Sequence, residues 1–490
     1  MRLTTAQTDR ACGAVLATAA GDALGAGYEF GAGPGSEGPR MIGGGLGNFA
    51  KGEWTDDTTM AWCVLDVAAK GVDLRSEDAL TEIARRFRGW YESGPADIGN
   101  QTRSVLSSGG HEPTGAALTA ASDALHARTG HTAGNGSLMR TAPVALGYLD
   151  DPEGLTEAAL AVSRLTHADP RAGEACVLWS HAIRHAILTG EIDVRAGLEH
   201  LEPEPAEYWT ARIDEAEAGP PERFARNGWV VEALQAAWSA IHHTPVPTDD
   251  PRRHLEDALA RAIGIGHDTD TVAAIAGGLL GARWGASAVP ARWRRILHGY
   301  PGLTGERLVG LAHLAASGGR PTSHGWPGLG RLPYDGWGQR RVLVRHPFDD
   351  GVWLGNVRAL DDLPESITAV VSLCLVGHEQ VPEGVVHVPF RLIDDAAEES
   401  NLNLAFVLRD AAELVAALRE EGHEVLVHCV AAQSRTPAVG IAYAMLRGVE
   451  YDEATKGVCS ALPSASPNQG FRRVLRQVIG GSGSCSSAMR

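Results

Sequence analysis

The strongest constraint on the fold is an abrupt change of composition between Ser317 and Arg340. This stretch, SGGRPTSHGWPGLGRLPYDGWGQR, contains too much Gly and Pro for a regular helix or strand. Ala, Leu, Glu and Arg dominate before it, and short β-branched runs follow it. With 490 residues, the chain also exceeds what one hydrophobic core usually serves. We therefore expect a multidomain protein with two unlike domains.

The first predicted domain, residues 8–317, has apolar side chains at helical spacing. Clear examples are the windows 76–91, 172–188 and 254–263, whereas alternating strand-like runs are scarce. These patterns predict an all-α domain.

A linker is predicted over 318–340, followed by a second domain over 341–480 and a disordered tail over 481–490. The second domain has β-branched runs at 342–344, 368–371, 385–388 and 425–427, which alternate with helical stretches at 404–419 and 437–446. This alternation predicts an α/β domain with a largely parallel central sheet.

The formal net charge of -17 argues against nucleic acid or an anionic membrane as the main partner, because phosphates repel such a field. No stretch approaches the roughly 20 apolar residues that span a bilayer, and the N-terminus lacks the apolar core of a signal peptide. We expect a cytoplasmic protein. The cysteines form no CxxC pair, which argues against a disulfide framework or zinc site.

Two acid-rich motifs precede helical stretches in the first domain. One contains Thr55, Asp56 and Asp57, and the other contains Asp268, Asp270 and Thr271. Hard divalent cations such as Mg²⁺ and Mn²⁺ prefer carboxylate and hydroxyl oxygens. The alternative is that each motif only caps a helix, since Ser, Thr and Asp are common there. The sequence by itself does not show whether the two motifs meet.

Six ordered motifs span nearly all of the first 315 residues: GDALGAGYEF, GEWTDDTTM, DIGNQT, GNGSLMRTAPVAL, THADP and GHDTDTVAAIAGGLLGARWG. In this order they closely resemble the ADP-ribosylglycohydrolase family. The resemblance implies an all-α orthogonal bundle with two Mg²⁺ or Mn²⁺ ions. The implied metal ligands are Thr55, Asp56, Asp57, Asp268, Asp270 and Thr271. Family members bind ADP-ribose and cleave the ribose C1″ bond to an amino-acid side chain.

The same resemblance implies that Glu29 is a mobile active-site acid, with Asp57 and Asp268 also catalytic. Glu29 precedes a stretch so rich in Gly that we expect a flexible loop, although an acid at a helix end is commonly just exposed. Asp97, Gly136, Ser137 and His167 match positions that line the ADP-ribose pocket. Without the resemblance, Gly136 and Ser137 also fit an ordinary turn, and His167 a structural histidine.

A reactive thiol is predicted in the second domain. Cys429 follows the run Val425 to His428 and precedes Arg435 in an H-C-x5-R-T loop. Backbone amides at a helix start, together with Arg435, suit a bound phosphate and favour a thiolate.

About 130 residues around this loop resemble the dual-specificity phosphatases, through VWLGNVRAL and PNQGF. The resemblance implies Cys429 as nucleophile, Arg435, Ser434 and Thr436 as phosphate-binding residues, and an acid from the loop containing Asp394 and Asp395. Spacing favours Asp395 and leaves Asp394 open. Ala432 replaces the family's usual loop glycine, so turnover is expected to be weak if that position needs positive φ.

The expected function is metal-dependent removal of ADP-ribose from a modified protein or small conjugate, with a second cysteine-dependent phosphatase activity on a phosphorylated substrate. The alternative is a phosphatase whose helical domain only binds ADP-ribosylated partners. Neither nucleic acid nor a membrane is expected as a partner.

Overall fold

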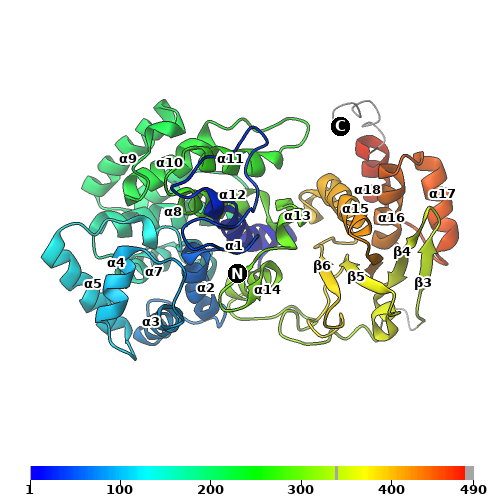
Figure 1. Ribbon diagram of the computed structural model, residues 1–490, viewed down its shortest axis with the longest axis horizontal. Helices are drawn as coiled ribbons and strands as arrows, with labels where there is room; N and C mark the ends of the chain where they lie inside the picture. Colours follow the sequence, from blue (N-terminus) through cyan, green and yellow to red (C-terminus); the bar gives the residue numbers. More distant parts are fainter. Residues whose placement is uncertain (1, 337–339, 480–490) are drawn as a thin grey trace. The chain divides into compact units, whose positions relative to one another are not determined.

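The computed structural model describes residues 2–336 and 340–479, which form two compact units (Figure 1). The first unit comprises 1–289 and 296–320, and the second comprises 290–295 and 321–490. The predicted disordered tail, 481–490, lies outside the described residues. Within the described ranges, no helix is long and apolar enough to cross a bilayer.

The first unit is helical, which confirms the predicted all-α fold. The windows 76–91, 172–188 and 254–263 lie in helices α3, α8 and α11. Its helices are α1 (Thr5–Gly25), η1 (Ala26–Tyr28), α2 (Asp56–Ala68), α3 (Glu77–Glu92), α4 (Asn100–Ser108), α5 (Gly115–Thr129), η2 (Asn135–Ser137), α6 (Ala142–Gly147), α7 (Pro152–Arg164), α8 (Pro170–Thr189), η3 (Val194–His200), α9 (Pro203–Ala218), η4 (Pro221–Arg223), α10 (Val230–His242), α11 (Arg253–Gly264), α12 (Thr269–Trp284), η5 (Ala286–Ala288) and α14 (Gly305–Ala316). A short β1–β2 ladder (His298–Gly299, Leu303–Thr304) precedes α14.

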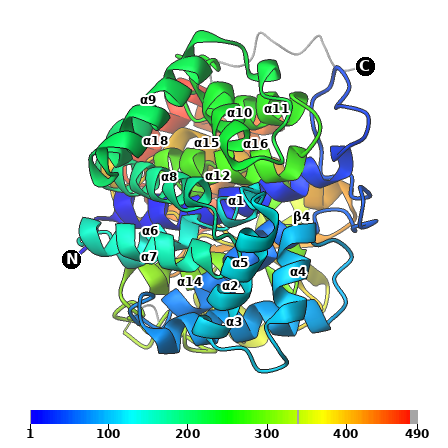
Figure 2. The ribbon, with the colours of Figure 1, turned by 90° about the vertical axis from the view of Figure 1, so that its left-hand side faces the viewer.

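Helices α1 and α12 pack against each other at the centre of this unit, as Figure 2 shows. They approach closely because glycines line the contact. A Cβ on Gly21 would lie 2.1 Å from the Ala273 carbonyl oxygen, and one on Gly25 would lie 2.4 Å from Asp270 Cα. Any larger residue would force the helices apart. This contact brings Asp22 on α1 beside the start of α12.

The second unit contains a five-stranded sheet in the order β3-β4-β7-β5-β6. The strands are β3 (Leu343–His346), β4 (Asp349–Asn356), β5 (Ile367–Ser372), β6 (Val386–Pro389) and β7 (Glu424–Cys429). Among the described strands of this sheet, only the β3–β4 pair is antiparallel. The prediction of an α/β unit with a largely parallel sheet is therefore confirmed.

Helices pack on both faces of this sheet and enclose its core. The helical segments of this part of the chain are η6 (Val357–Asp362), η7 (Glu398–Ser400), α15 (Leu404–Glu420), α16 (Arg435–Leu446), α17 (Tyr451–Ala461), α18 (Gln469–Val474) and the π-helical turn η8 (Leu475–Ile479), and all but η7 contribute side chains to that core. The β7 strand is central, so its C-terminal residue, Cys429, pairs with Asn356 of β4 inside the unit.

Helix α13 (Ala291–Arg294) lies in the segment 290–295, which belongs to the second unit although the chain on either side of that segment belongs to the first. The Ala291 amide donates to Asp410 Oδ2 at 2.9 Å, and Arg294 donates to the Pro389 carbonyl at 2.7 Å. Burial raises the pKa of Asp410 to about 6. The chain thus crosses between the units three times.

Candidate active sites

Both acid-rich motifs of the first unit lie at helix starts. Thr55 is the N-cap of α2 and Asp268 is the N-cap of α12, yet neither side chain accepts a capping bond from a described backbone amide. Thr55 Oγ1 instead donates to Asp57 Oδ2 at 3.0 Å. The structure therefore disfavours the reading in which these motifs serve only as helix caps.

Asp22 caps α2 from a different helix. Its Oδ1 accepts from the Thr55 amide at 2.9 Å, and its Oδ2 accepts from the Thr58 amide at 2.9 Å and the Thr58 hydroxyl at 2.6 Å. Asp22 is not among the site residues predicted from the sequence. Its signal was an acid inside Ala11 to Gly25, a helical stretch that is buried throughout.

Five carboxyl groups converge from four segments of the chain. Oxygens of Asp22, Asp57 and Asp270 lie within 4.8 Å of one another, and so do oxygens of Glu29, Asp268 and Asp270. Asp270 belongs to both triplets. Among the described residues, Glu29 Oε2 and Asp57 Oδ1 have no hydrogen-bond partner although both atoms are buried. The structure thus brings together two motifs that the sequence left apart.

Asp268 is held by a chain of amide side chains. Asn135 Nδ2 donates to Asp268 Oδ2 at 2.8 Å and to the Asn227 carbonyl at 2.8 Å. The Asp268 amide in turn donates to Asn227 Oδ1 at 3.2 Å. Neither asparagine was predicted, since a lone Asn in a turn carries little signal.

Glu29 follows helix η1, and its neighbour Phe30 donates its amide to the His267 carbonyl at 2.8 Å. Phe30 and His267 both have positive φ, 46° and 63°, which non-glycine residues rarely adopt. This backbone bond ties the Glu29 segment to the motif that contains Asp268 and Asp270.

The other predicted residues lie around this cluster in different ways. Thr271 donates its hydroxyl to Asp268, whereas Asp56 and Asp97 are close enough for their charges to act on Glu29. A Cβ on Gly136 would lie 3.1 Å from the buried His167 ring, so these two positions are in contact. Ser137 is buried, and its hydroxyl accepts from Cys176 Sγ at 3.5 Å.

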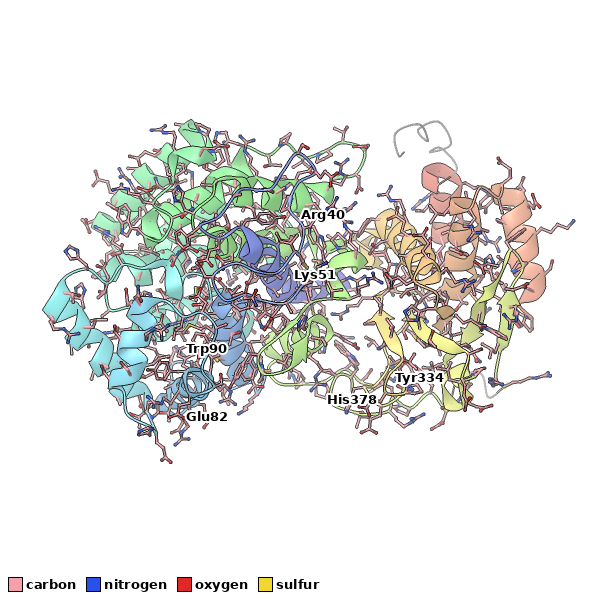
Figure 3. All side chains as sticks on the ribbon, in the orientation of Figure 1. Arg40, Lys51, Glu82, Trp90, Tyr334 and His378 are labelled. Atoms are coloured by element: carbon pink, nitrogen blue, oxygen red, sulfur yellow. The ribbon has the colours of Figure 1, made fainter. Side chains whose placement is uncertain are left out.

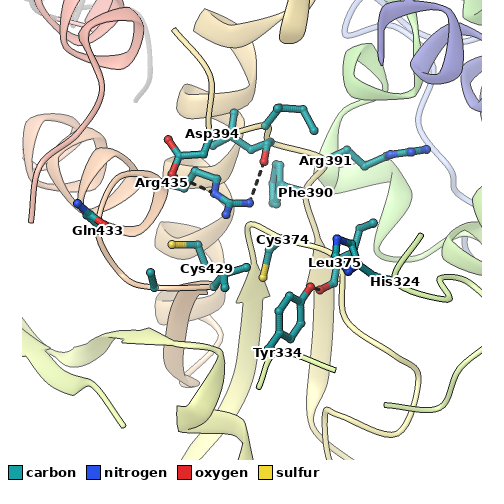
Figure 4. Close-up of a pocket in the computed structure, with 14 residues that line it drawn as sticks. His324, Tyr334, Cys374, Leu375, Phe390, Arg391, Asp394, Cys429, Gln433 and Arg435 are labelled. Atoms are coloured by element: carbon teal, nitrogen blue, oxygen red, sulfur yellow. Dashed lines mark hydrogen bonds and ion pairs between the residues drawn. The ribbon is translucent and has the colours of Figure 1, made fainter. Parts of the chain in front are cut away.

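The predicted thiol loop of the second unit connects β7 to α16. Cys429 ends the strand and Arg435 begins the helix, and both line a cavity of about 520 Å³ (Figure 4). Arg435 Nη1 donates to the carbonyls of Leu373 at 2.9 Å and Leu392 at 3.2 Å. Its guanidinium is therefore positioned by two loops beside the thiol.

Of the two candidate acids, Asp394 lines this cavity, and its Oδ2 lies 3.8 Å from Arg435 Nε. Asp395 is exposed and accepts from the Ala397 amide at 3.1 Å and the Ser400 hydroxyl at 2.8 Å. The geometry therefore favours Asp394, the alternative that the sequence left open.

Ser434 and Thr436 flank Arg435 and are both buried. Ser434 Oγ accepts from the Asn468 amide at 3.1 Å, and the Thr436 hydroxyl donates to the Gly355 carbonyl at 3.1 Å. Ala432 has a φ of 55°, in the left-handed region. This backbone conformation is strained for alanine, because its β-carbon comes too close to the following carbonyl oxygen.

A family model described as ADP-ribosylglycohydrolase matches residues 3–322. The chain belongs to this family. It is 32% identical over 296 residues to the ADP-ribosyl-[dinitrogen reductase] glycohydrolase of Rhodospirillum rubrum, covering 58% of this chain and 89% of that protein. Identity to the ADP-ribosylarginine hydrolase Tri1 of Pseudomonas putida (strain GB-1) is 31% over 304 residues, covering 58% and 73%.

A second model, described as dual specificity phosphatase, catalytic domain, matches residues 367–479. Dual specificity phosphatase 28 of Mus musculus is 35% identical over 131 residues, which cover 26% of this chain and 78% of that protein. The second unit is thus a member of the dual specificity phosphatases. Both families are hydrolases, so this protein is an enzyme of that class.

The acid cluster of the first unit fits a divalent cation. Burial raises the pKa of Asp22 to about 6 and that of Asp56 to about 7. Burial, followed by the Asp268 charge, raises the pKa of Glu29 to about 8. Burial is also the largest cause that raises the pKa values of the remaining cluster acids, Asp57, Asp268 and Asp270. Carboxylates crowded in this way require protons or cations to offset their charge.

Proposed function

We propose that the first unit removes ADP-ribose from a modified side chain, with two divalent cations, Mg²⁺ or Mn²⁺, as cofactors. The observation that carries this proposal is the pair of carboxylate triplets that share Asp270. Two triplets support two ions rather than one. Thr55, Asp56, Asp57, Asp268, Asp270 and Thr271 would hold the ions. When bound, such ions lower the pKa of water and stabilise developing negative charge.

The bond proposed to break joins ribose C1″ to a nitrogen of the acceptor side chain. Water supplies the hydroxyl that remains on ADP-ribose, and the departing nitrogen takes up a proton. Glu29 is proposed to move that proton through Oε2, because this atom is buried and without a hydrogen-bond partner among the described residues. A raised pKa near neutrality suits a group that alternates between acid and base.

The acceptor proposed is arginine, because a relative at 31% identity is named an ADP-ribosylarginine hydrolase. The test is release of free ADP-ribose from arginine-, serine- and acetyl-linked conjugates, with and without Mg²⁺ or Mn²⁺. Arginine-linked substrate should be cleaved only with metal, and EDTA should stop the reaction. Metal-independent release, or release from none of the three, contradicts the proposal.

A second activity, cysteine-dependent phosphatase chemistry, is supported by Cys429 and Arg435 lining one cavity. Cys429 Sγ would attack phosphorus, and the ester oxygen would leave with a proton from the aspartate loop, where Asp394 is favoured over Asp395. Water then hydrolyses the phosphocysteine. A generic aryl phosphate tests this step, and Cys429→Ser should abolish turnover.

The alternative is that only the phosphatase is active and the helical unit merely binds ADP-ribosylated partners. It predicts ADP-ribose binding without release from any linkage. Calorimetry with ADP-ribose, run beside the release assay, separates binding from cleavage.

A further inference from the structure

The segment 321–336, here called the strap, falls within the predicted linker but packs in the second unit. The strap contains neither a helix nor a strand over its described residues, 321–336. Backbone and side-chain bonds fix it on the loop 374–380. The Glu379 amide donates to the Gly330 carbonyl at 2.8 Å, and the Leu332 amide donates to Gln380 Oε1 at 3.0 Å.

Close packing also fixes the strap. A Cβ on Gly377 would lie 2.2 Å from the Gly330 carbonyl oxygen, so the strap backbone passes directly over that glycine. Trp326 of the strap is only 6% exposed, and the Arg391 guanidinium lies 5.3 Å from the centre of its ring. An unattached linker would have none of these contacts.

The strap forms one wall of the Cys429 cavity through His324 and Tyr334 (Figure 4). The Tyr334 hydroxyl donates to the Leu375 carbonyl, which fixes the ring and leaves its face to line the cavity. About 520 Å³ is within the usual range for small-molecule pockets. A phosphate bound at Cys429 would occupy only one end.

The chemistry of the cavity changes from one end to the other. Arg435 lies at the thiol end and the Tyr334 and Phe390 rings lie in the wall. His324 supplies a further nitrogen donor, and Arg391, whose guanidinium lies over the Trp326 ring, adds positive charge beside it. Two groups of donors separated by aromatic rings match a ligand with two anionic groups and a planar ring.

We infer that the strap makes the Cys429 cavity a site for the phosphomonoester of a nucleotide. The ester phosphate lies at Cys429 and Arg435, and the ring and second phosphate lie against Tyr334, His324 and Arg391. Turnover of such an ester rests on the proposed phosphatase function, whereas binding does not.

The test uses the full chain carrying Cys429→Ser and Asp268→Ala, so that neither unit turns over its ligand. Calorimetry compares adenosine 3′,5′-bisphosphate with phenyl phosphate, counting only binding that tungstate displaces, because tungstate occupies the phosphate position. The bisphosphate should bind at least about tenfold more tightly, since one charge-assisted contact contributes about that factor.

His324→Ala, at an exposed strap residue, should reduce this preference by about fivefold or more. His378→Ala is the matched control. His378 is likewise an exposed histidine of the second unit, but it does not line the cavity. Figure 3 labels its position. It should leave the preference unchanged.

Equal affinities for the two esters, or no effect of His324→Ala, overturns the inference even where the wild type hydrolyses phenyl phosphate. Tighter binding of a phosphotyrosine peptide than of the bisphosphate also overturns it, in favour of a protein substrate. A His324-dependent preference supports the inference even where the wild type hydrolyses neither ester, and only the phosphatase proposal then fails.

Discussion

The two candidate sites of this protein are built in opposite ways. The first gathers carboxylates from α1, the Glu29 segment and the starts of α2 and α12, and it concentrates negative charge. The second places its thiol and its guanidinium on one loop of consecutive residues, 429–435, and it attracts negative charge. A site assembled from distant segments depends on helix packing and counterions, whereas a site on one loop depends on local backbone conformation.

The largest effects are expected from two variants that test whether the two sites act independently of each other. Asp268→Ala should reduce ADP-ribose release by about a thousandfold, because it removes a charged group at the reacting centre, and leave aryl phosphate hydrolysis unchanged. Cys429→Ser should do the reverse. Each variant serves as the control for the other, and loss of both activities in one variant argues for shared chemistry.

The next effect concerns the two acids of the loop 393–397. Asp394→Asn should lower phosphatase kcat by about a hundredfold, the usual contribution of a general acid. Asp395→Asn, the matched control, should lower it little, since Asp395 binds Ala397 and Ser400. The opposite ranking would restore the preference for Asp395 that spacing gave.

Asp22 tests the dependence of the first site on packing. Asp22→Ala should weaken metal binding about 10- to 100-fold, the usual result of losing a partner that orients the ligands. The control is Asp9→Ala, because Asp9 also lies on α1 and accepts from the Ser287 amide, outside both triplets. Calorimetric titration with Mn²⁺ measures both, and equal affinities would remove Asp22 from the site.

The acids of the first site also predict a dependence of stability on pH. Their pKa values are raised by folding, so the folded protein binds more protons than the unfolded chain, and stability falls as pH rises. For metal-free protein the loss should run from about pH 4, where free acids titrate, to about pH 8, the pKa of Glu29.

The melting temperature of the first unit, measured in EDTA, should therefore fall by at least about 5 °C between pH 5 and pH 8. Excess Mn²⁺ should largely remove this slope, because cations replace the protons. A metal-free melting temperature that rises across this window would contradict the raised pKa values.

The smallest effect tests the local backbone of the second site. Ala432→Gly should stabilise the protein by about 1 kcal/mol, because glycine adopts a φ of 55° without strain. Ala431→Gly, at the preceding loop position, is the control and should not increase the free energy of unfolding. Denaturant unfolding measures both variants, and the phosphatase assay shows whether relief of strain also raises turnover.

The sequence predicted both folds, because the first unit has helical periodicity and the strands of the second unit carry β-branched runs. It located the loop 429–435 of the second site, because that loop is contiguous in the chain. It also located the starts of α2 and α12, where the acids lie. It could not predict Asp22 or Asn135, since their roles depend on contacts with residues far along the chain. Nor could composition show that the strap is packed, because Gly and Pro exclude regular elements without excluding contacts.

Helix α13 has a consequence for synthesis and for dissection of the chain. Ala291 leaves the ribosome long before Asp410, the residue to which its amide donates. All residues of the first unit are therefore synthesised before the segment 290–295 can bind its partner. The contact between α13 and Asp410 forms only after α15 has been synthesised. A cut within 318–340 would likewise leave α13 with one fragment and Asp410 with the other, so expression of intact halves requires a transferred copy of 290–295.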